Sequence, residues 1–422
     1  MIAEKDKIPN LTERNIKNNS IKFIVMISLH NVALMLSSGA VIQTFLLAFN
    51  IANTKVEFYT SYVLIFQCLA MFICSFLLDK IRNVKKSTSI CRFIFPIIFI
   101  SLVFVIISGI KNVDTIYVIV LLASMILNFA LGFYNALYYK QPYSIIHIDG
   151  FGRVESLAGV FSGMAGIGAS FLLSLFVGLF DYMAVMTVAF SVGAALWFIC
   201  ALLNASFKII NTEETVDKKS GSLKDFFTQP FFSKSILPTV LRGVGLGIIG
   251  LTVSIGVRDK ILTTETATGL TIMTSVSTVV GSLVYFFVEK RFKHRNIMIF
   301  SGVIAGLTIP FMTVGKSVIV LYILYFIGYL CITVIATAHP VLVYDAVPYE
   351  YIGRYSAWRM LFMTFGQLIP GFFISGLYGI IGSVGIMTIG ALCFLIAAIL
   401  FGLIFGKRGK VPKKDAETEE RG

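Results

Sequence analysis

Long apolar runs, separated by short polar stretches, follow one another along almost the whole chain. Each approaches the length of about 20 residues that spans a bilayer as an α-helix, and none shows the alternation of a membrane β-barrel strand. The expected spans are residues 23–48, 57–78, 93–110, 116–139, 156–180, 182–204, 235–256, 267–288, 297–314, 318–343, 357–377 and 382–405. This pattern predicts an all-α membrane protein with twelve transmembrane helices.

One long polar segment divides these spans into six and six. Residues 205–233 read ASFKIINTEETVDKKSGSLKDFFTQPFFS, which is the composition of a solvated linker and is too polar for hydrocarbon. We therefore expect an N-terminal tail at residues 1–21, a six-helix bundle at 22–204, the linker at 205–233, a second, pseudo-symmetric six-helix bundle at 234–406, and a C-terminal tail at 407–422.

The composition excludes an ordinary soluble protein. Of the 422 residues, 57% are hydrophobic and only 14% are charged, and the mean hydropathy is +0.87. Soluble domains carry about a quarter charged residues. The six cysteines fall in or beside apolar spans without a CxxC pair, and the four histidines are scattered. We therefore expect no disulfide, no metal site and no cofactor.

The positive charge of the chain follows the two sides of the membrane. The net charge is +13, and 29 of the 35 Lys and Arg fall in the tails, the linker and the alternate loops that share one side. The positive-inside rule places this side, with both termini and the linker, in the cytoplasm of a multi-pass cell-membrane protein. The charge therefore gives no reason to expect a nucleic acid as partner. The opposite side holds Lys55, Lys111, Arg258, Lys260 and Lys316, and Arg242 lies within a span.

The two halves repeat the same loop features in the same order, about 200 residues apart. The second and eighth spans each end in an acid and a lysine, followed by further basic residues. The loops after the fourth and tenth spans each contain a tyrosine, a proline four residues later and then a Gly-Arg pair. The paired positions are Asp79-Lys80 with Glu289-Lys290, and Gly152-Arg153 with Gly353-Arg354. This order indicates a duplicated six-helix unit whose repeats are parallel.

With these loops the chain resembles the major facilitator superfamily of secondary transporters. The resemblance covers residues from about 20 to about 405. It implies two six-helix bundles that enclose a central site and expose it alternately to the two sides of the membrane. The loop after the second span departs from the usual pattern of the family, because Ser75 stands where glycine is usual. The sequence therefore does not indicate a subfamily.

The resemblance also implies a gating role for the charged loop residues. Acids and arginines at the cytoplasmic surface would form a charge network between helices that steadies the outward-facing state. Simple anchoring at the membrane surface is the alternative. The expected gating residues are Asp79, Lys80, Glu289, Lys290, Arg153 and Arg354.

Few ionisable residues fall at depth in the expected spans. No Asp or Glu lies in the middle of any span, whereas His30 and Arg242 occupy matching positions in the first and seventh spans. Arg242 lies about 10 Å from the cytoplasmic end of its span, where it either reaches the interface or faces a cavity and binds an anion. His30 is either a packing residue or a proton carrier. The candidate binding residues are Arg242, His30, Gln43, Asn128, Asn135 and Gln367.

Glycines recur on two spans. Gly243, Gly247 and Gly250 share a helix face beside Arg242 and predict an open groove there, which favours the cavity for its side chain. The glycines at residues 159–166 of the fifth span have the spacing that permits close helix packing, or alternatively a hinge.

We therefore expect a secondary active transporter and not an enzyme, since no nucleophile, histidine cluster or pair of buried carboxylates is present. Arg242 and the missing acids favour an organic anion or another polar metabolite as the solute. A multidrug or lipid-like exporter is the alternative within the family, and a transport-inactive sensor or scaffold is the alternative from another class. The expected partners are the small-molecule solute, the lipid bilayer and a proton or another coupling ion, and we expect a monomer.

Overall fold

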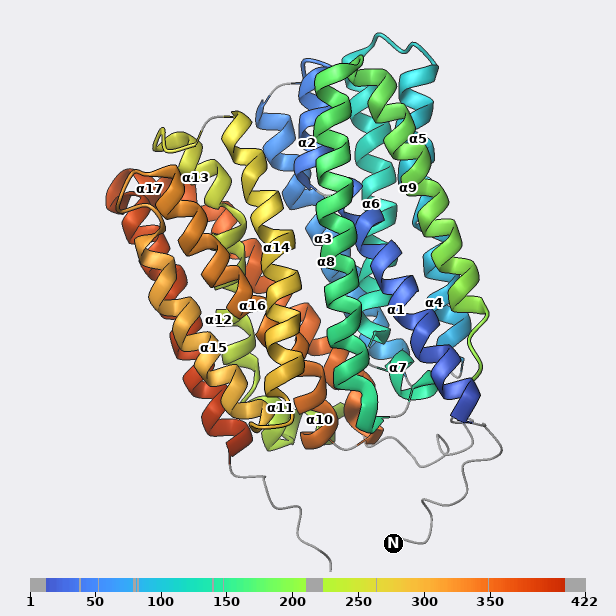
Figure 1. The fold of residues 1–422 in the computed structure, drawn as a ribbon, viewed down its shortest axis with the longest axis vertical. Helices are drawn as coiled ribbons and strands as arrows, with labels where there is room; N and C mark the ends of the chain where they lie inside the picture. The colour runs from blue at the N-terminus through green and yellow to red at the C-terminus, as the bar shows by residue number, and fades with distance from the viewer. Residues whose placement is uncertain are drawn as a thin grey trace, which may run out of the picture.

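Regular structure in this protein is helical wherever it is described. The computed structural model describes residues 13–37, 39–51, 53–78, 81, 83–138, 140–146, 148–209, 223–262, 264–347 and 349–406, and these contain no strand. Most of the helices run side by side along the long axis of the molecule (Figure 1). Eight of the described helices are long and apolar enough to cross a membrane, and three shorter apolar helices accompany them.

The N-terminal half provides the first six passes. Its helices are α1 (Glu13–Leu36), α2 (Gly39–Ala48), α3 (Asn53–Leu77), α4 (Val84–Ile94), α5 (Pro96–Ile107), α6 (Val113–Leu137), α7 (Lys140–Ile145), α8 (Ile148–Leu179) and α9 (Tyr182–Ala205). The pairs α1–α2 and α4–α5 each form one pass. The break between α4 and α5 falls at Pro96, which has no N–H to continue the helical hydrogen bonds.

The C-terminal half repeats this plan. Its elements are α10 (Leu223–Thr228), α11 (Pro230–Ser233), α12 (Ile236–Gly250), α13 (Thr252–Arg258), α14 (Thr264–Val288), α15 (His294–Thr308), the 3₁₀-helix η2 (Ile309–Met312), α16 (Val318–Ala346) and α17 (Tyr349–Gly406). The pair α12–α13 forms one pass. In contrast, α17 contains two passes, because the chain reverses at Gly382, whose φ of 66° is in the left-handed region that favours glycine.

The expected linker is only partly described. Residues 210–222 lie outside the described residues, and the rest of the segment begins with the end of α9 and finishes with α10 and α11. Phe226 and Phe232 of these two short helices are buried, and the ring of Phe226 lies 5.8 Å from that of Tyr351. The end of the linker is therefore packed on the C-terminal half.

The two halves meet closely along α8 and α14. A Cβ added at Gly163 would lie 2.5 Å from a methyl group of Val279 and 2.9 Å from the carbonyl oxygen of Ser275. The Ser156 hydroxyl of α8 donates to the carbonyl of Ser282 at 2.6 Å. The glycines of α8 thus let the backbones of the two halves approach each other, as expected for a packing role.

Aromatic rings join the halves on the opposite side of the molecule. Trp358 of α17 lies 6.0 Å, between ring centroids, from both Phe72 and Phe76 of α3. The ring of Phe227 in α10 lies 5.0 Å from the same tryptophan. These edge-to-face contacts stabilise the approach of α3 and α17.

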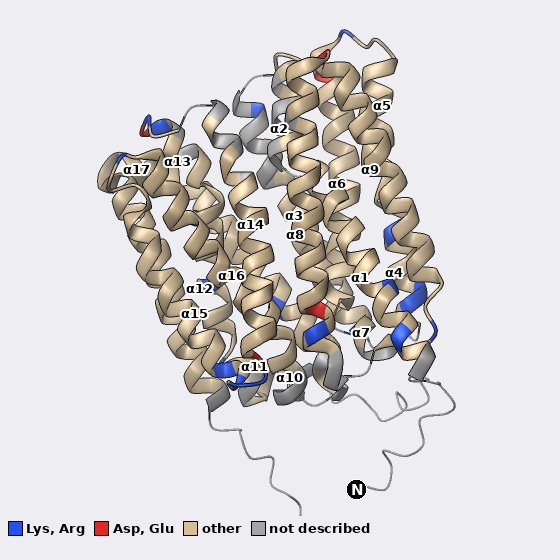
Figure 2. Cartoon of the chain, viewed as in Figure 1, with Lys and Arg blue, Asp and Glu red and all other residues tan. Residues whose placement is uncertain are grey.

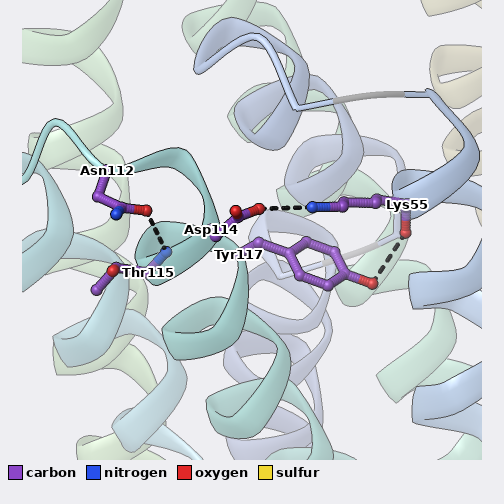
Figure 3. Close-up of polar contacts among 5 residues, drawn as sticks. All are labelled: Lys55, Asn112, Asp114, Thr115 and Tyr117. Carbon is purple, nitrogen blue, oxygen red and sulfur yellow. Dashed lines mark hydrogen bonds and ion pairs between the residues drawn. The ribbon is translucent and has the colours of Figure 1, made fainter.

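Polar contacts tie the N-terminal ends of α3 and α6 together (Figure 3). Lys55 Nζ lies 2.5 Å from Asp114 Oδ1, and the Tyr117 hydroxyl donates to the carbonyl of Lys55 at 3.1 Å. The Asn112 side chain accepts from the backbone N–H of Thr115 at 3.1 Å and so caps the start of α6. The ion pair is exposed and adds little to stability, whereas the cap fixes where the helix begins.

Charged residues gather at one end of the molecule. Lys and Arg are frequent at the lower end in Figure 2, where α1 begins and α9 ends, and are sparse at the upper end. Three of the 29 basic residues assigned to cytoplasmic loops and span ends are instead buried within helices: Arg92 in α4, and Arg354 and Arg359 in α17. The imbalance between the two ends remains without them.

Candidate functional site

A cavity of about 340 Å³ lies between the two halves. The N-terminal half contributes residues of α1, α6 and α8, together with Tyr138 just after α6, and the C-terminal half contributes residues of α12, α16 and α17. The lining residues are Ile27, His30, Asn31, Leu34, Tyr134, Asn135, Tyr138, Glu155, Arg242, Ala336, His339, Arg359, Met360 and Met363. A polar cavity enclosed by both halves is the place where a bound molecule would contact both at once.

The wall from the C-terminal half is cationic. Arg242 of α12 is 7% exposed and lines the cavity, so its side chain does not extend along the helix to the membrane surface. Arg359 of α17 lies on the same wall, and the charges of both arginines act on His339 of α16. His339 is 1% exposed, and neither of its ring nitrogens has a hydrogen-bond partner among the described residues.

The wall from the N-terminal half contains an acid that the sequence analysis did not identify. Glu155 does not lie in the middle of its pass, but α8 begins at Ile148 and so places this acid inside the helix, where it lines the cavity. Both oxygens of Glu155 accept from the Tyr138 hydroxyl, at 2.8 and 3.0 Å. No described Lys or Arg forms an ion pair with this carboxyl group.

The remaining candidate binding residues fall into three groups. His30 and Asn135 line the cavity. Asn128 is not a lining residue, and its side chain donates to the carbonyl of Ser124 on its own helix at 2.8 Å. Gln367 faces α12 with its backbone instead of lining the cavity. The side chain of Gln43 lies outside the described residues.

The glycine groove predicted beside Arg242 is not open. A Cβ at Gly247 would lie 2.7 Å from the carbonyl oxygen of Gln367, and one at Gly243 would collide with the carbonyl of Met363. Only Gly250 has free space around it. The glycines therefore let α12 pack directly on α17, and this close approach brings Arg242 and Arg359 onto one wall.

The gating residues are brought together only in part. Arg153 Nε lies 3.3 Å from Glu289 Oε1, so an ion pair joins α8 to the turn after α14, across the two halves. Lys290 is exposed, and Arg354 is buried in α17. Asp79 and Lys80 lie outside the described residues. Burial raises the pKa of Glu289, while the hydrogen bond and the charge of Arg153 act in the opposite direction.

Within the part of the chain that the structure describes, no three of His, Cys, Asp and Glu come together in a group that could hold a metal ion. The arrangement can instead bind an anion at the arginines, hydrogen-bond a polar solute and hold a proton at Glu155.

Comparisons with known proteins concern the family of the chain and its fold. The family model described as the Major Facilitator Superfamily matches residues 235–422. The solved fucose:proton symporter FucP of E. coli is 14% identical and has a TM-score of 0.72, covering 93% of this chain and 99% of its own. The proton:xylose symporter XylE, solved with 6-bromo-6-deoxy-D-glucose, is 12% identical with a TM-score of 0.70, covering 92% and 95%.

A bacterial homologue of the iron transporter ferroportin, in an outward-facing state with soaked iron, has the same fold. It is 13% identical with a TM-score of 0.66, covering 92% of this chain and 98% of its own. At such identities the likeness concerns the fold. No curated protein sequence matches the chain.

The fold is that of multi-pass membrane transporters built from two helical halves. The C-terminal half of the chain, residues 235–422, matches the model of the major facilitator superfamily, and the whole chain has the fold of solved members of that family. The resemblance to this family and the predicted twelve-helix fold are thereby confirmed, and the proteins that the chain matches are transporters.

The ion pair between Arg153 and Glu289 yields a prediction about gating. Glu289→Gln removes one charge of a contact that holds the two halves together, so the population of the state closed at this end should fall. Arg291→Gln, two residues further on and exposed, serves as the matched control. Accessibility of a cysteine introduced at Asn31 in the cavity, measured from each side of the membrane in proteoliposomes, checks the population.

Low pH should also lower the population of the state closed at this end in the wild-type protein. The pKa of Glu289 is raised, so its carboxylate is lost as the pH falls through that value, and the ion pair is lost with it. Equal accessibility in Glu289→Gln, Arg291→Gln and wild type would show that the ion pair has no gating role.

Proposed function

We propose that this protein is a proton-coupled secondary transporter for a small solute that carries an anionic group. The observation that carries the proposal is the pair Arg242 and Arg359 on one wall of a cavity that both halves enclose. A guanidinium group within the membrane is expensive and is retained chiefly where it has a function. Its planar fork of donors matches a carboxylate or a phosphate, which supports an organic anion as solute.

Glu155 supports a proton as the coupling ion. Its carboxyl group lines the cavity with a tyrosine hydroxyl as its hydrogen-bond partner and no cation in an ion pair with it. A carboxylate at such a site either takes up a proton or requires a cation from the solute. Two proteins of the same fold, FucP and XylE, are named as proton symporters.

Alternating access fits the contacts between the halves. Arg153–Glu289 and the aromatic contacts of Trp358 join them beyond the cavity, at the end where the described chain begins and finishes. For the solute to leave on this side, these contacts have to open while others form at the far end. A marginal ion pair, worth about 1 kcal/mol or less when partly exposed, can be broken and remade in such a cycle.

A lipid-like solute has one observation in its favour. An apolar groove of about 490 Å³ lies among α1, α8 and α9 and is lined by aliphatic and phenylalanine side chains. However, the groove belongs to the N-terminal half alone. A rocking motion between the halves would not transfer its contents from one side to the other, so we favour the polar cavity as the transport site.

The orientation of the protein follows from its charge asymmetry. We place the basic end, with both termini and the linker, in the cytoplasm. A cysteine at Ser220 of the linker, in a background without reactive native cysteines, should then react with an impermeant thiol reagent only after the cells are broken. A cysteine at Lys316, exposed at the opposite end, is the matched control and should react in intact cells. The reverse pattern would invert the topology.

The anion site is tested with the purified protein and arginine variants. Small carboxylates and phosphate esters are first screened for those that raise its thermal unfolding midpoint, since a ligand stabilises the state to which it binds. Arg242→Lys and Arg359→Lys should then weaken binding of the best compound by about tenfold or more, because a lysine does not reproduce the planar fork.

Arg258 offers a matched control for these variants. Its guanidinium carbon lies 3.8 Å from the ring centroid of Tyr378, and it is not among the residues that line the cavity. Arg258→Lys should leave the affinity unchanged. Unchanged affinity in the Arg242 and Arg359 variants as well, or stabilisation only by uncharged solutes, would contradict an anionic substrate.

A further inference from the structure

Arg92 is a fully buried arginine that the proposed binding site does not use. Its side chain is 0% exposed within α4, and no described acid forms an ion pair with it. Its Nη2 donates to the Tyr134 hydroxyl at 2.5 Å, and its guanidinium carbon lies 4.4 Å from the centroid of the same ring. Its Nη1 lies 3.4 Å from Nδ1 of His30. An uncompensated buried charge of this kind is costly and calls for a functional explanation.

His30 receives two donors on one ring nitrogen. The indole Nε1–H of Trp197 donates to His30 Nδ1 at 3.1 Å, and Arg92 approaches the same nitrogen. Tryptophan and arginine side chains can only donate, so Nδ1 has to be the acceptor and carries no proton. The proton of the neutral ring is then on Nε2. This nitrogen has no described hydrogen-bond partner, and the residue lines the cavity.

Arg92 also fixes the hydrogen-bonding role of Tyr134. Its oxygen accepts from Arg92, so its own O–H is left to donate elsewhere, and the residue lines the cavity beside His30. We propose that Arg92 is a positioning residue that fixes His30 as a neutral Nε2–H donor and Tyr134 as an O–H donor. Together they form an acceptor-binding wall opposite Arg242 and Arg359.

This inference extends the proposed function. The part that concerns solute binding rests on that proposed function. A solute anion would be held by charged donors of the C-terminal half and by neutral, polarised donors of the N-terminal half. Contact with both halves is what a solute needs if its binding is to respond to their relative movement. The coupled proton is then carried by Glu155 and not by His30.

The electrostatic surroundings of His30 favour its neutral form as well. The charged or titratable groups near it come from every neighbouring pass: Arg92 on α4, Tyr134 on α6, Tyr138 after α6, Glu155 on α8, Cys200 on α9, Arg242 on α12, His339 on α16 and Arg359 on α17. Three of these are permanent cations and one is an acid, which is bonded to Tyr138. A second proton on His30 would meet two N–H donors at Nδ1 and a guanidinium beside it.

The state of His30 can be observed directly and without any solute. The full chain, labelled with ¹⁵N in its histidine rings and reconstituted in lipid bilayers, gives nitrogen signals that distinguish the two tautomers and the imidazolium. The signal of His30 is assigned by its loss in His30→Gln. We expect an unprotonated Nδ1 and a protonated Nε2, unchanged between about pH 5.5 and 8, the range in which an ordinary histidine titrates.

Variants of Arg92 test whether this arginine keeps His30 neutral. Arg92→Gln removes the cation and should allow His30 to become protonated within this range, whereas Arg92→Lys keeps a cationic donor and should preserve the neutral signal. Trp197→Phe, which removes the other donor, should also release Nδ1 and serves as a second variant if Arg92→Gln does not fold. A titrating His30 in wild type, or a proton on Nδ1, would overturn the inference, and so would a His30 that stays neutral in both Arg92→Gln and Trp197→Phe.

The role of His30 in binding the solute is tested by a separate measurement. In the carboxylate-binding assay, Arg92→Gln should add to the wild-type pH dependence of affinity a further dependence that is lost in the double variant with His30→Gln. A neutral His30 in the spectra together with carboxylates that do not bind would contradict the proposed solute while leaving the role of Arg92 intact. In the Arg92→Gln background, a carboxylate affinity that depends on pH identically with and without His30→Gln would remove His30 from the site.

Discussion

The low dielectric of the membrane interior is the constraint on which this structure depends. A charge there is stable only if other polar groups or water meet it, so buried charges cannot be scattered through the helices. In this protein Arg242, Arg359 and Glu155 all reach one cavity, and Arg92 lies directly behind its wall. Most of the other described residues that are buried are hydrophobic. These buried charges therefore lie at one cavity, and both halves are needed to form it.

Close packing decides which charges can meet. Gly243 and Gly247 allow the backbones of α12 and α17 to touch, and this contact places two arginines from separate passes on one wall. The glycines of α8 do the same between the halves, which brings Glu155 to the opposite wall. The walls thus differ in character: permanent cations on one, and an acid with neutral donors on the other. A solute anion and a proton can occupy such a cavity together, because each has its own wall.

Much of the fold could be predicted from the sequence, and less of the site. Apolar run length and the repeated Gly-Arg loops predicted twelve passes in two halves, since both are local features. Arg242 and His30 could be identified because an ionisable residue stands out inside an apolar run. Glu155 and Arg359 could not, since they follow polar loop residues and the sequence does not show where a helix begins. Likewise, the filling of the glycine groove depends on α17, more than a hundred residues away in the chain.

Proton coupling at Glu155 is tested most directly by measuring whether protons move together with the solute. Wild-type protein and Glu155→Gln are reconstituted in proteoliposomes that contain a pH-sensitive dye, and a carboxylate that the purified protein binds is added outside. Wild type is expected to move protons together with the solute. Glu155→Gln is expected to bind the solute and exchange it across the membrane, but to move no protons. Proton movement that is undiminished in Glu155→Gln, or absent from wild type while the solute is transported, would contradict proton coupling at Glu155.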